Sequence, residues 1–338
     1  MSDETTEVRT HGMRGLKRHV PVDATVSATG PVDLTGPADY DATQGHKHYA
    51  MQGNDTLPNC FFAAAVHSRT TQAVESVDGN ATVFVKGFEI DPTDAGAALY
   101  EEYVASQGET MPGSGTDPYS GTTFLLGKGY WKYAGVLGPT SRTAKDEPYF
   151  EPLTVKEAIF DFQGGAILLL ALDPDAEQEF EDDEPWGTQS STPDDNDGHA
   201  VSGVKYQQGN PITTCITWAA LEGMLEEFDI NCIEGLVLTI SDAFILKNGQ
   251  AAADALVAKW GLQTSPTLAA SEADSTPPTP EDVPRTPVTP KGPEDLLARA
   301  RGIEADLRHL VEMAIKRIPE QEIFAAMEKM IEFYLQNP

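Results

Sequence analysis

The sequence has few cysteines, no long apolar run and little positive charge, and each shortage excludes a class of protein. Its three cysteines are widely spaced, which predicts neither a disulfide framework nor a zinc site, and we expect a reducing compartment or a virion interior and no metal. No apolar run reaches the roughly 18 residues of a membrane span. Residues 1–20 carry charges without an apolar core, so we expect no secretory signal.

Basic residues are far fewer than acidic residues. The chain has 23 Lys and Arg residues against 53 Asp and Glu residues, which gives a formal net charge of −30. So negative a protein repels phosphates, and this argues against sequence-independent binding of nucleic acid by its surface. We therefore expect an acidic protein, cytoplasmic or virion-associated, with no nucleic-acid partner and no membrane partner.

Proline and glycine divide the chain into four parts. Residues 1–45 predict an irregular N-terminal arm, and residues 46–262 carry the apolar patterns of a folded domain. Residues 263–292 are rich in proline, serine, threonine and acids, which predicts an extended linker. Residues 293–338 predict a helical tail.

The tail has the pattern of a coiled coil. Apolar residues alternate by four and three over 294–317, at Leu296, Ala300, Ile303, Leu307, Leu310 and Ala314. Pro319 breaks this helix, and a second amphipathic helix follows. We predict a helical hairpin that forms a homo-oligomer or binds a virion partner through residues 294–335. Packing of the hairpin back on the main domain is the alternative.

Within the main domain, helical patterns come first and strands follow, so we expect an α+β fold with a mainly antiparallel sheet. Asp91 and Pro92 predict the start of a helix, and residues 166–172 form an apolar strand. The stretch 218–228 is expected to continue as a short helix. Residues 173–198 hold eleven Asp or Glu residues, and so charged a loop is expected to face solvent without order.

The chemistry of the chain centres on residues 51–68. A polar turn, with Pro58 and Asn59 as helix-starting residues, leads into an apolar helix that begins at Cys60. A cysteine at a helix N-terminus feels the positive end of the helix dipole, which favours the thiolate. We therefore identify Cys60 as a candidate nucleophile; a buried core cysteine is the alternative.

A histidine with the complementary role follows far downstream. His199 stands at the entrance of a strand in the segment DDNDGHAVSGVKY. Cys60 and His199 together indicate nucleophilic catalysis in which the imidazole takes the thiol proton and returns it to a leaving group. His67 lies seven residues beyond Cys60, about 10 Å along the helix axis, so we expect it to be structural.

Three short motifs carry a family resemblance. GNDTLPNCFFA (53–63), GHAVSGVKY (198–206) and TWA (217–219) occur in the order of papain-like cysteine peptidases. The chain most resembles uncharacterised papain-like proteins of actinobacteria and their phages, over about residues 45–246. The resemblance implies a nucleophile helix packed on an antiparallel sheet. It also implies cleavage of amide bonds in a peptide or cell-wall substrate, by a peptidase or peptidoglycan amidase, without a cofactor.

The same resemblance suggests further site residues. Asn54, six residues before Cys60, takes the place of the amide side chain that stabilises the oxyanion, although an Asn that caps a turn would look the same. Trp218 is our candidate substrate-binding residue and is expected to shield the histidine from water, although an ordinary core aromatic residue would look the same. Ile216 stands where the family has an Asn that orients the histidine, so Thr217 is our candidate for that role. A backbone carbonyl or a remote acid, Glu234 or Asp242, is the alternative.

The departure at Ile216 keeps a second function open. A papain-like domain without an orienting side chain is expected to be slow or inactive. The chain would then be a non-catalytic module of a phage structural or accessory protein that assembles through its C-terminal helices. A third hypothesis is autoprocessing by cleavage within residues 263–292.

Overall fold

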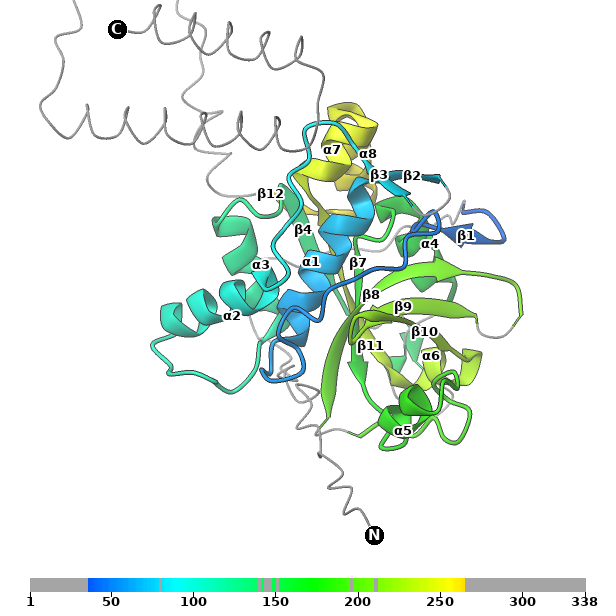
Figure 1. Ribbon diagram of the computed structural model, residues 1–338. Coiled ribbons are helices and arrows are strands. Elements are labelled where there is room, and N and C mark those ends of the chain that lie inside the picture. The colour runs from blue at the N-terminus through cyan, green and yellow to red at the C-terminus, as the bar shows by residue number, and fades with distance from the viewer. Residues whose placement is uncertain are drawn as a thin grey trace, which may run out of the picture. The chain divides into compact units, whose positions relative to one another are not determined.

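The computed structural model describes residues 36–264, except for residues 79–80, 139–140, 143–147, 150–151, 195–196 and 210–211. In this part the chain forms one eight-stranded antiparallel sheet, two small hairpins and helices packed on the sheet (Figure 1). The expected α+β class with an antiparallel sheet is thereby confirmed. The predicted linker beyond residue 264 and the predicted helical tail lie outside the described residues.

The large sheet has the order β10-β9-β8-β7-β11-β4-β12, and β1 pairs with the far end of β8. Its strands are β1 (Tyr40–Asp41), β4 (Tyr133–Leu137), β7 (Ala166–Ala171), β8 (Gly198–Tyr206), β9 (Thr213–Thr217), β10 (Ala220–Met224), β11 (Ile233–Ile240) and β12 (Gln263–Thr264). The hairpins are β2 (Val74–Asp78) with β3 (Ala81–Phe84), and β5 (Ser141–Arg142) with β6 (Pro148–Tyr149). Because β1 joins the sheet, the end of the predicted N-terminal arm is part of the folded domain.

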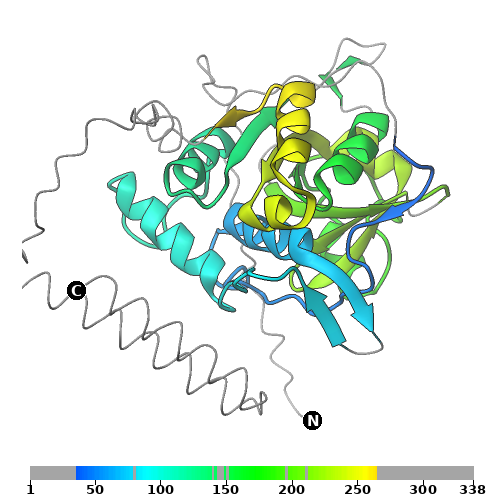
Figure 2. The same ribbon diagram turned by 90° about the horizontal axis from the view of Figure 1, so that it is seen from above.

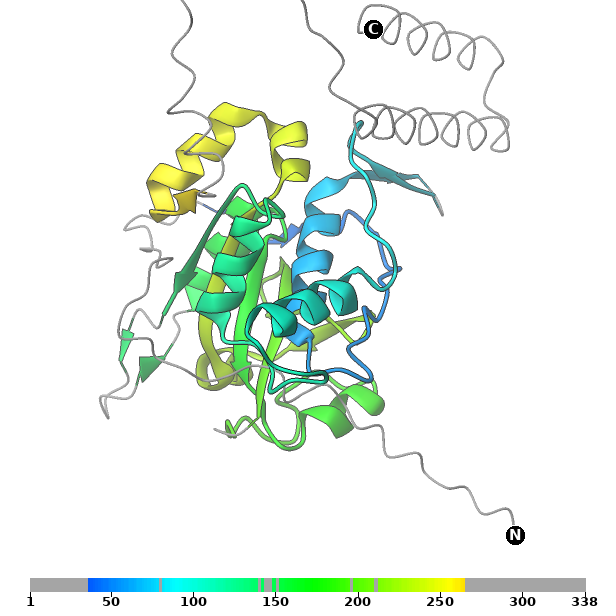
Figure 3. The same ribbon diagram turned by 90° about the vertical axis from the view of Figure 1, so that its left-hand side faces the viewer.

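The helices pack on both faces of the sheet. They are α1 (Cys60–Ala73), α2 (Ala95–Ser106), α3 (Pro118–Gly127), α4 (Pro152–Phe162), α5 (Ala176–Glu181), α6 (Glu226–Cys232), α7 (Asp242–Asn248) and α8 (Gln250–Trp260). Figure 2 shows α7 beside α1, and Figure 3 shows α1 and α2 together on one side of the sheet. The predicted start of α2 at Pro92 is wrong by three residues: the N–H of Ala95 donates to the Pro92 carbonyl, so a turn precedes the helix.

The sheet separates two apolar cores because successive strand residues point to opposite faces. Ala166, Leu168 and Leu170 of β7 join the core that contains α4, α6 and α8. Ile167 and Leu169 join the core of α1, α2 and α3. All six residues of β7 are buried, which agrees with the continuous apolar run in the sequence.

The expected helix over residues 218–228 is partly wrong. Residues 220–224 form the strand β10, which pairs in register with β9, and the helix α6 begins only at Glu226. Trp218 and Ala219 have φ angles of +40° and +65° and make the two-residue turn between the strands. Pairing with β9 therefore overrides the helix preference of Ala, Leu, Glu and Met.

The expectation for the acidic segment is partly wrong: most of its described acidic residues are exposed or half-buried, but the segment is ordered. The described residues of 173–197 include the helix α5, and Trp186 within the segment is completely buried. Two carboxylates are buried as well, and both accept main-chain N–H groups. Glu179 accepts from Gly187 at 2.8 Å and also from Gln189, and Asp173 accepts from Asp175 at 2.8 Å. Acidic residues here organise the loop instead of only solvating it.

Candidate active site

Cys60 is the first residue of α1, as the sequence predicts. Its N-cap is Asn59, and the N–H groups of Phe62 and Ala63 donate to the Asn59 carbonyl. The Cys60 side chain is fully buried in the core formed by α1, α2 and α3. The sulfur therefore lies at the positive end of the α1 dipole and away from solvent.

His199 is the second residue of β8 and is also fully buried. Its Nε2 lies 3.0 Å from the Thr217 hydroxyl oxygen. Trp218 stacks on the imidazole with ring centroids 5.2 Å apart and 24° between the ring planes, and the Trp186 ring lies 6.4 Å away, edge to face. The imidazole is thus fixed by one hydrogen bond and two indoles.

The other ring nitrogen of His199 has no such anchor. Nδ1 is buried and makes no hydrogen bond in the structure, so it is not hydrogen-bonded to the Cys60 sulfur. Burial lowers the pKa of His199 to about 3, and the imidazole is therefore neutral at neutral pH. A neutral imidazole has one nitrogen that donates and one that accepts.

Cys60 and His199 lie at the same end of α1 and β8. The Ser68 and Ser202 hydroxyl oxygens are 3.1 Å apart, and further along α1 the side chain of Thr71 packs against Gly164, next to the start of β7. The start of β7 pairs with Gly203, so α1 and β8 run in the same direction. Cys60 is eight residues before Ser68, about 12 Å along a helix. His199 is three residues before Ser202, about 10 Å along a strand.

Strand alternation explains why the two side chains are not hydrogen-bonded. Ala200 belongs to the core of α1, and Ser202 contacts α1. His199 alternates with them and contacts Trp186 and Trp218, whose side chains belong to the core on the opposite face. The structure therefore brings the two predicted residues to one end of the fold without coupling them.

Asn54 lies in the turn before Cys60 and is buried. Its main-chain N–H donates to the Met51 carbonyl, and its side-chain Oδ1 has no hydrogen-bond partner in the structure. His67, expected to be structural, places its Nε2 2.8 Å from the Ala50 carbonyl. Asn54 Oδ1 therefore does not cap the turn. His67 holds the segment before the turn against α1.

The alternatives for orienting His199 have different surroundings. Ile216 is buried with Tyr49 and Val204 in a separate apolar cluster. Both Asp242 carboxylate oxygens accept from the Arg69 guanidinium at 3.0 Å, so Asp242 is engaged elsewhere. The Thr217 hydroxyl lies within hydrogen-bond distance of the imidazole. Sequence reasoning missed Trp186, and a lone Trp inside an acidic segment is the signal that could have found it.

The described residues also bear on metal binding, disulfide formation and membrane-spanning helices. Among them, no group of three or more His, Cys, Asp or Glu side chains is arranged to hold a metal ion. All three cysteines are buried and form no disulfide. Burial raises the pKa of Cys215 and of Cys232, so both remain thiols at neutral pH. No helix in this part of the chain is long and apolar enough to cross a membrane.

Comparison with known proteins shows a weak structural similarity to a cysteine protease. No protein-family model matches the chain, and no curated protein matches it in sequence. Among solved structures, xylellain, a cysteine protease from Xylella fastidiosa, is similar with a TM-score of 0.42 and 14% sequence identity. The match covers 69% of this chain and 97% of xylellain. A similarity of this size does not by itself establish a shared fold.

Proposed function

We propose that the chain is a papain-like cysteine hydrolase that cleaves amide bonds, as a peptidase or a peptidoglycan amidase. Cys60 is the nucleophile, His199 the general base and acid, and Thr217 the group that orients His199. Asn54 and the Cys60 main-chain N–H stabilise the oxyanion. No step needs an organic cofactor or a metal.

The state of His199 carries this proposal. Its Nε2 is 3.0 Å from the Thr217 hydroxyl, while its Nδ1 is buried without a partner at the end of the fold that holds Cys60. When Nε2–H donates to Thr217, Nδ1 carries the lone pair that a proton acceptor needs. A buried polar atom without a partner is costly, and a role in catalysis is one explanation for its retention.

The chemistry follows from these positions. The Cys60 thiol gives its proton to Nδ1 of His199 as the sulfur attacks the substrate carbonyl carbon. The tetrahedral intermediate collapses, the C–N bond breaks, and His199 returns the proton to the leaving amine. Water, deprotonated by the same nitrogen, then hydrolyses the thioester and frees Cys60. Because His199 contacts the core on the face of the sheet opposite to that of Cys60, the first transfer requires a rearrangement that brings the imidazole to the α1 face.

Thiol labelling tests the proposal. Iodoacetamide labelling of Cys60 would be followed from pH 5 to pH 9 by peptide mass spectrometry, in the native protein and in His199→Ala. Cys215 and Cys232 serve as internal controls because their raised pKa values keep them protonated. We expect labelling of Cys60 well below about pH 8.5, the value of a free thiol, and slower labelling in His199→Ala. Labelling that appears only above that pH and ignores His199 would overturn the proposal.

A second candidate function also has an observation in its favour. Cys60 and His199 are both fully buried and not hydrogen-bonded to each other, which suits a domain that binds without catalysis. In this alternative the chain is an inactive papain-like module of a phage structural or accessory protein. It would assemble through residues 294–335, and the acidic domain would be displayed at the end of the linker.

Oligomeric state separates the alternatives when combined with labelling. The non-catalytic module predicts an inert Cys60 together with an oligomer that becomes a monomer when residues 293–338 are deleted. Sedimentation velocity of the full chain and of the deletion variant measures this. A reactive Cys60 in a full chain that is monomeric would contradict the non-catalytic alternative.

A further inference from the structure

The turn before Cys60 has an unusual backbone. Residues 51–59 carry Asn54 and end at the N-cap of α1, so their conformation sets where the candidate oxyanion donor and the nucleophile lie. Gln52 and Gly53 are consecutive residues with φ angles of +59° and +77°. Glycine adopts this region readily, but glutamine does so only when its surroundings hold it there.

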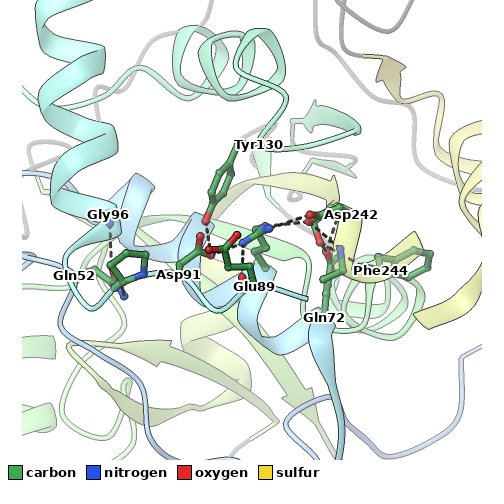
Figure 4. Close-up of polar contacts among 12 residues, drawn as sticks. Gln52, Gln72, Glu89, Asp91, Gly96, Tyr130, Asp242 and Phe244 are labelled. Atoms are coloured by element: carbon green, nitrogen blue, oxygen red, sulfur yellow. Dashed lines mark hydrogen bonds and ion pairs between the residues drawn. The ribbon is translucent and has the colours of Figure 1, made fainter. Parts of the chain in front are cut away.

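Gln52 is held by three hydrogen bonds. Its side-chain Oε1 accepts from the Gly96 N–H at 2.9 Å, and its Nε2 donates to the Pro92 carbonyl at 3.5 Å. Its main-chain carbonyl accepts from Nδ2 of Asn59 at 2.7 Å. Figure 4 shows Gln52 beneath the start of α2, with the bond to Gly96 drawn. The side chain thus contacts the start of α2, and the main chain contacts Asn59, the N-cap of α1.

The bond to Gly96 fills a gap in α2. Asp94 is the N-cap of this helix but makes no side-chain capping bond, so the first N–H groups need partners from elsewhere. Gln52 supplies one from another segment. Gly96 packs tightly against Gln52 and α1, since a Cβ on Gly96 would lie 2.8 Å from Gln52 Cβ and 3.2 Å from the Ala63 backbone.

The segment that receives the Gln52 amide is itself fixed. Pro92 follows Asp91, whose carboxylate accepts from Arg69 at 2.8 Å and from the Tyr130 hydroxyl at 3.1 Å. Arg69 lies on α1 and also binds Asp242 at the start of α7. Figure 4 shows the Tyr130 hydroxyl pointing at Asp91, with Asp242 on the other side of the same group of polar contacts. The Pro92 carbonyl that accepts from Gln52 is therefore next to a residue, Asp91, that is bound to α1 through Arg69.

We infer that Gln52 is a positioning residue for the candidate active site: it sets the turn 51–59 against α2 and so places Asn54 and Cys60. The inference rests on the proposed function for the meaning of that placement. Gln52 does not touch the reacting atoms, because its side-chain amide is occupied by Gly96 and Pro92. Its role is to hold the left-handed turn that the nucleophile follows.

Three variants test this role. Gln52→Met keeps the size of the side chain and loses both hydrogen bonds of the side-chain amide, to Gly96 and to Pro92. Gln52→Glu keeps an acceptor for the Gly96 N–H, and its negative charge suits a helix N-terminus. Gln163→Met is the matched control, because Gln163 also has a positive φ (+50°) and exchanges amide hydrogen bonds with Asn248, on α7. The measurements are amide hydrogen exchange over residues 51–60 and the pH profile of Cys60 labelling.

We expect Gln52→Met to speed exchange over residues 51–60 by about tenfold, and to shift Cys60 labelling to higher pH. Gln52→Glu should restore both readouts, and Gln163→Met should change neither. Exchange and labelling in Gln52→Met equal to the native values would overturn the inference. Native labelling that ignores His199→Ala would instead overturn the proposed function, and exchange would still decide whether Gln52 holds the turn.

Discussion

Trp218 stacks on His199 with its ring centroid 5.2 Å from the imidazole, and it does so from a backbone φ of +40°. A bulky aromatic residue rarely adopts this left-handed conformation, and Ala219 beside it has a φ of +65°. Backbone strain of this kind concentrates at functional sites, where the surrounding structure holds it in place. The β9–β10 turn therefore places an indole on the candidate base at a cost in local stability.

Relief of strain in this turn is the first testable prediction. Ala219→Gly should stabilise the protein or leave it unchanged, by up to about 1 kcal/mol, because glycine has no left-handed penalty. The same change at Ala255, an exposed position inside α8, should destabilise by about 1 kcal/mol. Urea unfolding of both variants measures the difference, and two destabilisations of equal size would contradict the strain.

Thr217 gives a prediction about the imidazole. Thr217→Val removes the hydroxyl but keeps the shape, so Nε2 of His199 would be left buried without a partner. We expect a loss of about 1–3 kcal/mol in the free energy of unfolding and slower labelling of Cys60. Thr217→Ser keeps the hydroxyl and should retain the labelling rate. A Thr217→Val protein that labels at the native rate would exclude Thr217 as the orienting group.

The acidic segment gives a prediction about stability. Glu179→Ala would leave the N–H groups of Gly187 and Gln189 without their carboxylate partner, and we expect a loss of at least about 2 kcal/mol. Glu181→Ala, at an exposed position two residues later, should change stability by less than about 0.5 kcal/mol. Chemical unfolding of the two variants provides the measurement. Equal effects would mean that the segment is only a solvated loop.

Asp229 gives a prediction about pH. Burial raises the pKa of its carboxyl to about 8, despite a hydrogen bond from Thr213. The folded protein therefore keeps a proton that the unfolded chain releases near pH 4, so stability is full below that value and falls as pH rises towards 8. His67, with a pKa lowered to about 4, and His199, lowered to about 3, act in the opposite direction, but only below about pH 6.5.

Between pH 6.5 and 8 the decline should therefore appear, and we expect it to be on the order of 2 kcal/mol for Asp229. Asp229→Asn is neutral at every pH and should make this decline smaller. A part should remain, because burial raises the pKa of Glu222 to about 8 as well. Urea midpoints at pH 6.5 and pH 8.5 in both proteins make the comparison. An unchanged slope in Asp229→Asn would show that Asp229 already ionises at the usual pH in the folded state.

The local patterns of the sequence were enough to predict much of the fold. The helix that begins at Cys60, the buried strand over 166–171 and the strand of His199 all occur where apolar spacing and capping residues place them. These features depend on neighbours within a few residues, which is why spacing reveals them. The class of the fold followed from their order along the chain.

Other features depend on contacts between distant residues, and the sequence could not show them. The strand β10 forms because β9 pairs with it, although its residues favour a helix. The acidic segment orders because its carboxylates find main-chain N–H groups up to 19 residues away. Trp186 is buried beside His199 for the same reason.

The same distinction between local and long-range features applies to the candidate site. The sequence by itself predicted Cys60 and His199 as candidates from residue type and local motif, and it offered Thr217 as one of several candidates to orient His199. Only the tertiary structure decided that Thr217 meets Nε2, that Nδ1 is left without a partner, and that Gln52 ties the turn before Cys60 to α2. The physical reason is that hydrogen-bond partners and burial are set by how β8, β9, α1 and α2 pack together, and packing joins residues that are far apart in sequence.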